Sequence, residues 1–120
     1  MKRTRTTNPE LVQIIRYLKK QSGETHAHIW RDVAERLAKP RRNRTAVNLS
    51  RLDRHSGPKE TVVVPGKVLG AGRISHRVNV AAFSFSDKAK AKIVAARGRP
   101  MSLPQLVKKN PKGTNVKLIG

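Results

Sequence analysis

The stretch from Lys39 to Arg44, KPRRNR, places four cationic side chains among six residues. Three of the four are arginines, whose planar guanidinium group can donate two parallel hydrogen bonds to one phosphate. Arg51 and Arg54 follow in the next segment, which has apolar residues typical of a folded core. Cations held at a fixed spacing are suited to neutralising successive phosphates of a nucleic-acid backbone. The stretch therefore predicts a site for a polyanion.

The net charge of the whole chain supports this interpretation. The chain has 27 Lys and Arg side chains against 7 Asp and Glu, a formal charge of +20. Residues 1–60 carry 15 basic and 6 acidic side chains (net +9), and residues 61–120 carry 12 and 1 (net +11). Because so basic a chain repels itself in isolation, we expect a polyanion to neutralise it, and nucleic acid is the commonest one. Both halves are expected to face anions.

Aromatic residues are scarce in this sequence. Tyr17, Trp30, Phe83 and Phe85 are too few and too scattered for a base-stacking surface that reads single strands. Trp30 lies on the apolar side of a predicted helix and is interpreted as a core residue. Recognition is therefore expected to use phosphate, sugar and shape. The chain has no cysteine, which excludes a disulfide framework and a thiolate zinc site.

Few residues are arranged for catalysis. The segment 67–72, KVLGAG, is no P-loop, and it is no dinucleotide-binding fingerprint because Ser75 occupies the third glycine position. The acids lie mostly beside cations on predicted helices, and no serine has an elbow motif. The four histidines are His26, His28, His55 and His76. They are interpreted as structural or RNA-facing residues, so we expect no enzyme, no cofactor, no metal and no small-molecule substrate.

Two helices are predicted near the N-terminus. The segment 8–10, NPE, combines an N-cap asparagine, a first-turn proline and an acid at the positive end of the helix dipole. Gly23 is expected to stop this helix, and a second helix is predicted over 27–38. The short link predicts a helical hairpin over 8–39. The residues before it, 1–7, have no apolar anchor and are predicted to form a flexible basic arm.

Beyond the Arg-rich stretch, strand and helix patterns alternate. Strands are predicted over 46–52, 61–65, 78–83 and 116–119, and Pro65-Gly66 is expected to end the second of them. Ser86-Asp87 begins a helix over 88–97 that Gly98 stops, and Ser102 caps another over 103–109. We predict an α/β fold in a single domain, residues 1–120, with a mixed α/β body over 40–120.

Targeting signals are not evident. The basic N-terminus is not followed by the apolar segment of a signal peptide. No apolar run approaches the ~18 residues of a membrane span. We therefore expect a soluble intracellular protein with no membrane partner.

The region around the opening stretch resembles the signature of a ribosomal protein family, the large-subunit L-eighteen-e proteins of archaea and eukaryotes. The landmarks are Leu37, Pro40-Arg41, Arg44, Val47-Asn48-Leu49 and Arg51-Leu52. Three more blocks agree, VVVPGKVLGAG (62–72), VAAFSFSDKAKAKI (80–93) and NPKGTNVKLI (110–119). The similarity runs in order along essentially the whole chain. One departure is Arg99, where family members often carry a glycine; it adds a cation and leaves the local turn open.

The resemblance implies a fold, a location and partners. The fold would be the irregular β-β-α superhelix of the bacterial ribosomal protein L-fifteen, here preceded by the helical hairpin. The location would be the large subunit of cytoplasmic ribosomes. The partners would be large-subunit ribosomal RNA and neighbouring ribosomal proteins, and the function would be structural support of translation.

The predicted RNA-binding residues form three groups. Lys2, Arg3 and Arg5 lie in the arm, and Lys39, Arg41, Arg42, Arg44, Asn48, Arg51 and Arg54 lie in and after the Arg-rich stretch. A second surface is predicted from Lys67, Arg73, Arg77, Arg97 and Arg99. The main alternative is a chromatin-type basic protein, which would prefer duplex DNA. An RNA-processing enzyme lacks a recognisable constellation, and a membrane-surface protein would need a more basic helix than the first, which has Arg16, Lys19 and Lys20.

Overall fold

The computed structural model describes residues 9–39, 45–58 and 60–119. In these ranges five helices and five strands follow one another along the chain. The helices are α1 (Pro9–Thr25), α2 (His28–Leu37), α3 (Leu49–His55), α4 (Asp87–Ala95) and α5 (Leu103–Lys109). The strands are β1 (Thr45–Asn48), β2 (Thr61–Leu69), β3 (Asn79–Phe85), β4 (Arg99–Ser102) and β5 (Val116–Leu118).

All strand pairs in the sheet are parallel. The order across the sheet is β1-β2-β3-β4, and β5 pairs with β2 as well. Residues 61–63 of β2 pair with β5, and residues 66–69 pair with β1, so two short strands share one edge of β2. β4 pairs with β3 at the other end of the sheet. Parallel sheets need cover on both faces, because their connections bring helices onto them.

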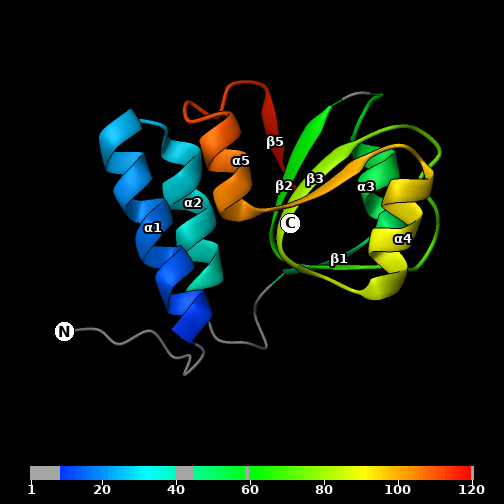
Figure 1. Ribbon diagram of the computed structural model, residues 1–120, viewed down its shortest axis with the longest axis horizontal. Coiled ribbons are helices and arrows are strands. Elements are labelled where there is room, and N and C mark those ends of the chain that lie inside the picture. The colour runs from blue at the N-terminus through cyan, green and yellow to red at the C-terminus, as the bar shows by residue number, and fades with distance from the viewer. Residues whose placement is uncertain (1–8, 40–44, 59, 120) are drawn as a thin grey trace.

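Helices cover the sheet on both faces, and Figure 1 shows the resulting three layers. α1, α2 and α5 lie on one side, where their apolar residues form a core with Val63, Ala81 and Met101. α3 and α4 lie on the other side, around a second core that includes Val62 and Val80. Neighbouring residues of one strand enter different cores because side chains alternate along a strand.

The helical hairpin forms as predicted, with one difference at its turn. Leu11, Ile15 and Leu18 of α1 are buried against α2. The predicted N-cap Asn8 lies outside the described residues. Gly23 does not stop α1, which continues to Thr25, and His26 takes the left-handed φ of 59° that ends the helix. The prediction was wrong because a helix interior tolerates glycine at a cost of about 1 kcal/mol.

Trp30 joins the hairpin to the C-terminal part of the chain. Its side chain is fully buried, which confirms the predicted core role. Its Nε1 donates a hydrogen bond of 2.7 Å to the carbonyl oxygen of Pro111. A buried indole needs such a partner. The hairpin is therefore fastened to the turn that precedes β5.

The strand predicted over 46–52 is wrong in its second half, because α3 begins at Leu49. Leu49 and Leu52 are both buried, as residues three apart on one face of a helix are. The helix start is fixed from far along the chain, since the Ser50 amide donates to the Ala71 carbonyl at 3.2 Å. Local alternation alone could not reveal this partner.

β2 continues through Pro65-Gly66, where the sequence predicted its end. A register shift against β3 falls between Val64 and Lys67, so the strand bulges at this point. On the other edge, Pro65 lies between the residues paired with β5 and those paired with β1. The proline is tolerated because no ladder bond is required of it there.

The end of α4 differs from its prediction, which gave a helix over 88–97 stopped by Gly98. The helix begins as predicted, because the Ser86 side chain accepts from the Ala89 amide. At the other end Arg97, with a φ of 65°, takes the left-handed position expected of a glycine. Gly98 N donates to Ile93 O at 2.9 Å, which completes a Schellman motif. A side chain on Gly98 would collide with the carbonyl of Val78, so this glycine permits close approach of two backbones.

The predicted α/β class and the N-terminal helical hairpin both agree with the structure. β4 has no counterpart among the predicted strands, whereas α5 and its Ser102 cap match the prediction and form a full capping box with Gln105. The finer description as an irregular β-β-α superhelix stays a prediction.

Candidate nucleic-acid interface

The connection between β2 and β3, residues 70–78, is held at its beginning by hydrogen bonds between its backbone and side chains of other elements. We call each such set of hydrogen bonds a clasp. The Ala71 amide donates to Oδ1 of Asn48 at 3.3 Å. Lys92 of α4 donates from Nζ to the carbonyl oxygens of Gly70 and Gly72, at 2.8 and 2.7 Å. A charged donor shared between two carbonyls is a strong restraint. This part of the connection is therefore fixed between β1 and α4.

A second clasp holds the middle of the same connection to α3. Oδ1 of Asp53 accepts from the Ser75 amide at 2.9 Å and from the Ser75 hydroxyl at 2.7 Å. His76 Nε2 lies 3.3 Å from the same oxygen. The hydrogen bond from the Ser75 amide, then that from its hydroxyl, lower the pKa of Asp53 below its ordinary value. Asp53 is thus a structural carboxylate that orders the connection.

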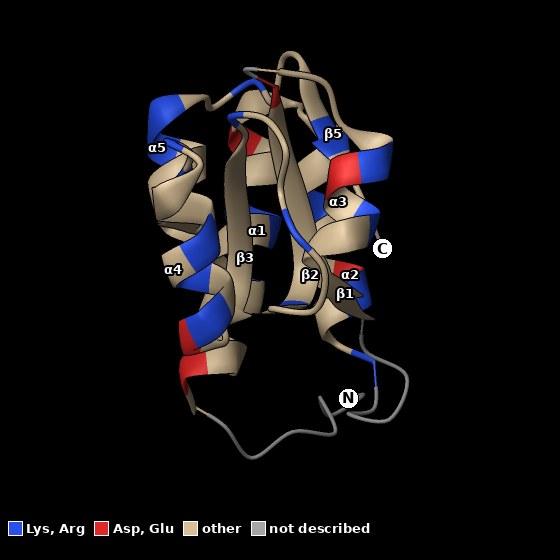
Figure 2. Ribbon diagram, turned by 90° about the vertical axis from the view of Figure 1, so that its right-hand side faces the viewer, with Lys and Arg blue, Asp and Glu red and all other residues tan. Residues whose placement is uncertain are grey.

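The clasps hold a group of exposed arginines, which we call the α3–loop surface. It consists of Arg51 and Arg54 on α3 and Arg73 and Arg77 on the β2–β3 connection. None of the four forms a salt bridge with a carboxylate of the described residues. Figure 2 shows basic segments on both α3 and the connection in front of the sheet. The surface offers four guanidinium groups to an external anion from an ordered backbone.

Several predicted residues lie near this surface or outside the described part of the chain. Lys39 follows α2 and is exposed, and Lys67 is exposed on β2, paired in register with Ala46 of β1. Asn48 is half-buried and holds the Ala71 amide, so its side-chain oxygen has a structural partner. Lys2, Arg3, Arg5, Arg41, Arg42 and Arg44 lie outside the described residues.

Arg97 and Arg99 lie beside the end of the same connection. They flank Gly98, where the chain passes from α4 into β4. The Arg99 amide donates to the Val78 carbonyl at 3.3 Å, and Arg99 pairs in register with Asn79 of β3. Both arginines therefore adjoin the part of the connection that carries Arg77.

Lys92 is a residue that the sequence analysis missed. It lies on α4 among Lys88 and Lys90 and has the same chemistry as these neighbours. Its distinction is its half-buried position and its two carbonyl partners, which are 20 and 22 residues away. A three-lysine pattern carries no signal that singles it out. Gly70 and Gly72 were a weak indication of this contact, because glycine is common where other groups approach the backbone closely.

The histidines are spread over separate parts of the structure. His26 and His28 line a hollow of about 450 Å³ at the hairpin turn, together with Lys19, Arg31 and Glu35. Within the ranges that the structure covers, no three His, Asp or Glu side chains gather as a metal site would require. The hollow also contains the Arg31–Glu35 ion pair, with its nitrogen and oxygen 3.2 Å apart.

None of the described helices combines the length and the apolar character that crossing a bilayer requires.

Comparison with known proteins finds relatives along the whole chain. The family model described as "Ribosomal protein 60S L18 and 50S L18e" matches residues 1–120. Large ribosomal subunit protein eL18 of Methanothermobacter thermautotrophicus is 52% identical over 113 residues, which are 94% of this chain and 93% of that protein. The eL18 protein of Archaeoglobus fulgidus is 50% identical over 115 residues, 96% of this chain and 98% of its own. The eL18 protein of Methanoregula boonei is 47% identical over 113 residues, 94% of this chain and 93% of its own.

Proposed function

Because the chain belongs to the family of ribosomal proteins 60S L18 and 50S L18e, we propose that it is a structural constituent of the large ribosomal subunit. Its archaeal relatives carry the name large ribosomal subunit protein eL18. The proposed partners are large-subunit ribosomal RNA and neighbouring ribosomal proteins, and the proposed location is the cytoplasmic ribosome. No reaction is assigned to it.

The observation that carries the RNA-binding role is the α3–loop surface. Four exposed arginines that form no salt bridge within the described residues stand on a backbone that Lys92 and Asp53 hold in place. An ordered backbone reduces the entropy that is lost when RNA binds. Each phosphate neutralised by an arginine releases condensed counterions, which favours association. The surface therefore binds the RNA backbone through charge and fixed spacing.

The proposal extends to residues outside the described ranges on the basis of their sequence. Arg41, Arg42 and Arg44 immediately precede β1, and Lys2, Arg3 and Arg5 precede α1. We assign them phosphate contacts alongside Lys39 and Lys67. We also propose that residues 1–120 act as one domain, and that β2, β3 and α4, which are consecutive along the chain, form a β-β-α unit of a superhelix.

A sedimentation experiment tests this function. We expect the protein to travel with the large subunit through a sucrose gradient at physiological salt and to leave it at high salt. In equilibrium binding to a structured fragment of large-subunit RNA, the plot of log affinity against log salt should fall by about 0.7 to 0.9 per phosphate contact. Replacing Arg51, Arg54 and Arg73 by glutamine should make this slope shallower by the corresponding amount.

Two results would contradict the proposal. The first is a protein that stays among free proteins in the gradient at every salt concentration. The second is a preference for duplex DNA over the structured RNA in direct competition, which would favour a chromatin-type role. A charge-matched variant on α1, with Arg16, Lys19 and Lys20 replaced by glutamine, is the control for a general loss of charge.

A further inference from the structure

The edge of the sheet formed by β4 is flanked by cations on both sides. In the described sheet β4 pairs with β3 on one edge and leaves its other edge without a strand. α4 packs near β4 on one face of the sheet and α5 on the other. In Figure 2, α4 and α5 lie on one side of the view and α3 and β1 on the other, while Figure 1 shows α5 and α4 on opposite faces of the sheet.

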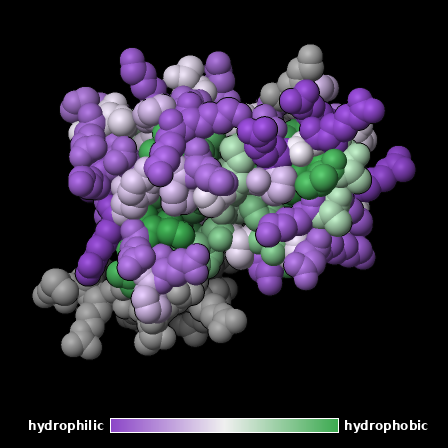
Figure 3. All heavy atoms as spheres, viewed as in Figure 1, coloured by the Kyte–Doolittle hydropathy of each residue, from purple (hydrophilic) through white to green (hydrophobic). Residues whose placement is uncertain are grey.

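The sequence around this edge is strongly basic. Residues 88–119 contain nine Lys and Arg side chains and no Asp or Glu. In Figure 3, hydrophilic side chains surround the places of α4 and α5, with less polar surface at the centre and over part of α4. A surface with this composition attracts anions and repels other cations.

A hollow lies between β4 and α5. It has a volume of about 350 Å³ and is lined by Arg99, Pro100, Met101, Gln105 and Lys109. Arg99 and Lys109 bring a guanidinium and an ammonium group to it from β4 and α5. Pro100 and Met101 contribute apolar surface, so the hollow combines two cations with a less polar lining.

Gln105 adds a donor of fixed orientation. Its Oε1 accepts from the Ser102 amide at 2.9 Å, as part of the capping box of α5. Because the oxygen is engaged, the side chain presents its NH₂ group as the remaining polar end. The hollow is thus lined by a guanidinium, an ammonium and an amide donor, a set that suits a phosphate.

We propose that Arg99, Gln105 and Lys109, named here the β4-edge surface, form a second RNA-backbone site that seats a phosphate in this hollow. This inference rests on the proposed function. Because α5 and α3 cover opposite faces of the sheet, the two surfaces contact separate segments of RNA. The protein then links two parts of the folded RNA across its own sheet.

An added β-strand from another protein is a poorer occupant of this edge. Pro100 has no amide hydrogen, so β4 cannot present a complete set of backbone donors to a partner strand. Among the described residues Val94 is the exposed large hydrophobic side chain, and it lies on α4. Charges and proline at an edge also discourage strand-to-strand aggregation, and that role by itself would need no phosphate contact.

Cross-linking within assembled subunits tests the proposal. Large subunits are assembled with the full chain, irradiated with ultraviolet light, and the RNA cross-links are mapped by sequencing. The edge variant carries Arg99→Gln and Lys109→Gln, and the loop variant carries Arg51→Gln, Arg54→Gln and Arg73→Gln. The control, which removes at least as much charge as either variant, carries Arg16→Gln, Lys19→Gln and Lys20→Gln on α1.

We expect two clusters of cross-links far apart in the RNA sequence. The edge variant should lose one cluster and keep the other, the loop variant should show the reverse, and the control should keep both. Equal thermal unfolding midpoints would show that the substituted chains remain folded. The inference is overturned if the edge variant keeps every RNA cross-link, which would leave a role against aggregation, or if the edge cross-links only to protein. Absence of any RNA cross-link in the unsubstituted protein would instead overturn the proposed function.

Discussion

The helical hairpin and the α/β body differ in their net charge. Residues 9–39 carry 6 basic and 4 acidic side chains, a net charge of +2. Residues 61–119 carry 12 basic side chains and 1 acidic side chain, a net charge of +11. The lengths differ by a factor of about two, and the net charges differ far more. The excess of positive charge is therefore a property of the body, and the hairpin is close to neutral.

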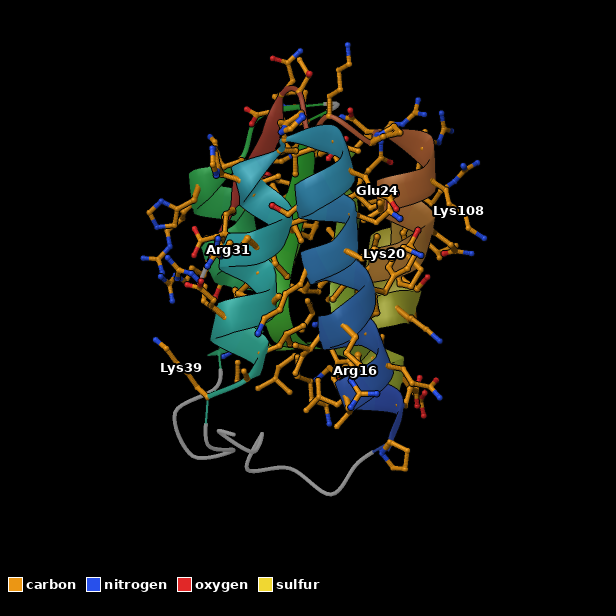
Figure 4. All side chains as sticks on the ribbon, turned by 90° about the vertical axis from the view of Figure 1, so that its left-hand side faces the viewer. Arg16, Lys20, Glu24, Arg31, Lys39 and Lys108 are labelled. Atoms are coloured by element: carbon orange, nitrogen blue, oxygen red, sulfur yellow. The ribbon has the colours of Figure 1, made fainter. Side chains whose placement is uncertain are left out.

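The hairpin satisfies much of its charge internally. Arg31 pairs with Glu35 and Arg36 pairs with Asp32, one helical turn apart on α2. In Figure 4, Arg16, Lys20 and Glu24 follow one another along the outer side of α1, with an acid ending the row, while Lys108 projects from α5. Exposed pairs of this kind contribute little to stability. What holds the hairpin is its apolar packing, whereas the β2–β3 connection depends on charged hydrogen-bonding groups.

The largest effect is expected where the hairpin meets the rest of the chain. Trp30→Ala removes a fully buried side chain and its hydrogen bond to Pro111. We expect the free energy of unfolding to fall by about 3 to 5 kcal/mol. Trp30→Phe should cost less, because it keeps most of the packing. Urea unfolding followed by circular dichroism measures both, and a loss below about 1 kcal/mol for Trp30→Ala would contradict packing as the dominant force here.

A smaller effect is expected from the body's main clasp. Lys92→Met keeps the length of the side chain but removes the two hydrogen bonds to Gly70 and Gly72. Hydrogen bonds to charged groups contribute about 1.5 to 3 kcal/mol, so a loss of this order is expected. Amide hydrogen exchange should become faster in residues 70–78 while α1 and α2 keep their protection.

Lys90→Met is the matched control for this substitution. Lys90 lies on the same helix, is exposed and has the same charge. It should leave the exchange of residues 70–78 unchanged. If both variants speed the amide exchange of residues 70–78 equally, the Lys92 hydrogen bonds are not what orders the connection. The hairpin and the body would then differ only in net charge.

The sequence predicted those parts of the fold that depend on neighbours along the chain. α4 and α5 start at Ser86 and Ser102 because a serine hydroxyl accepts from an amide three residues later. α3 was missed, because its first turn is bonded to Ala71, more than twenty residues away. The strand order could not be predicted either, since the positions of β5 and β1 along β2 depend on packing of the whole chain.

The candidate site follows the same division. That arginines such as Arg51 and Arg73 would be exposed could be predicted from their chemistry. That Lys92 would turn inward to hold the connection could not, because the carbonyls that it binds are brought near only by the fold. For the same reason, the sequence could not show that Arg99 lies beside Asn79 with its amide bonded to the Val78 carbonyl.

The smallest effect concerns Asp53, which the Ser75 amide and hydroxyl stabilise as a carboxylate. Its pKa is lowered in the folded state, so its contribution to stability is present above the ordinary carboxyl pKa. That contribution is lost as the pH falls below this value through the lowered one. Asp53→Asn should therefore flatten the acid limb of a plot of unfolding free energy against pH.

Asp32→Asn on the hairpin is the corresponding control, because Asp32 makes a surface ion pair with Arg36. We expect this variant to keep an acid limb close to that of the unsubstituted protein. If the two variants behave alike, Asp53 is not the structural carboxylate of the connection, and the contrast between the regions weakens.

The sharing of one β2 edge by β1 and β5 has a consequence for biosynthesis. β5 pairs with residues 61–63, and the turn before it accepts the indole hydrogen bond of Trp30. During synthesis from the N-terminus, both β2 and Trp30 are complete long before residues 116–118 are added. Until residues 111–118 are added, the growing chain therefore leaves this edge of β2 open and Trp30 without its Pro111 partner, and this part of the fold closes through contacts between distant parts of the chain.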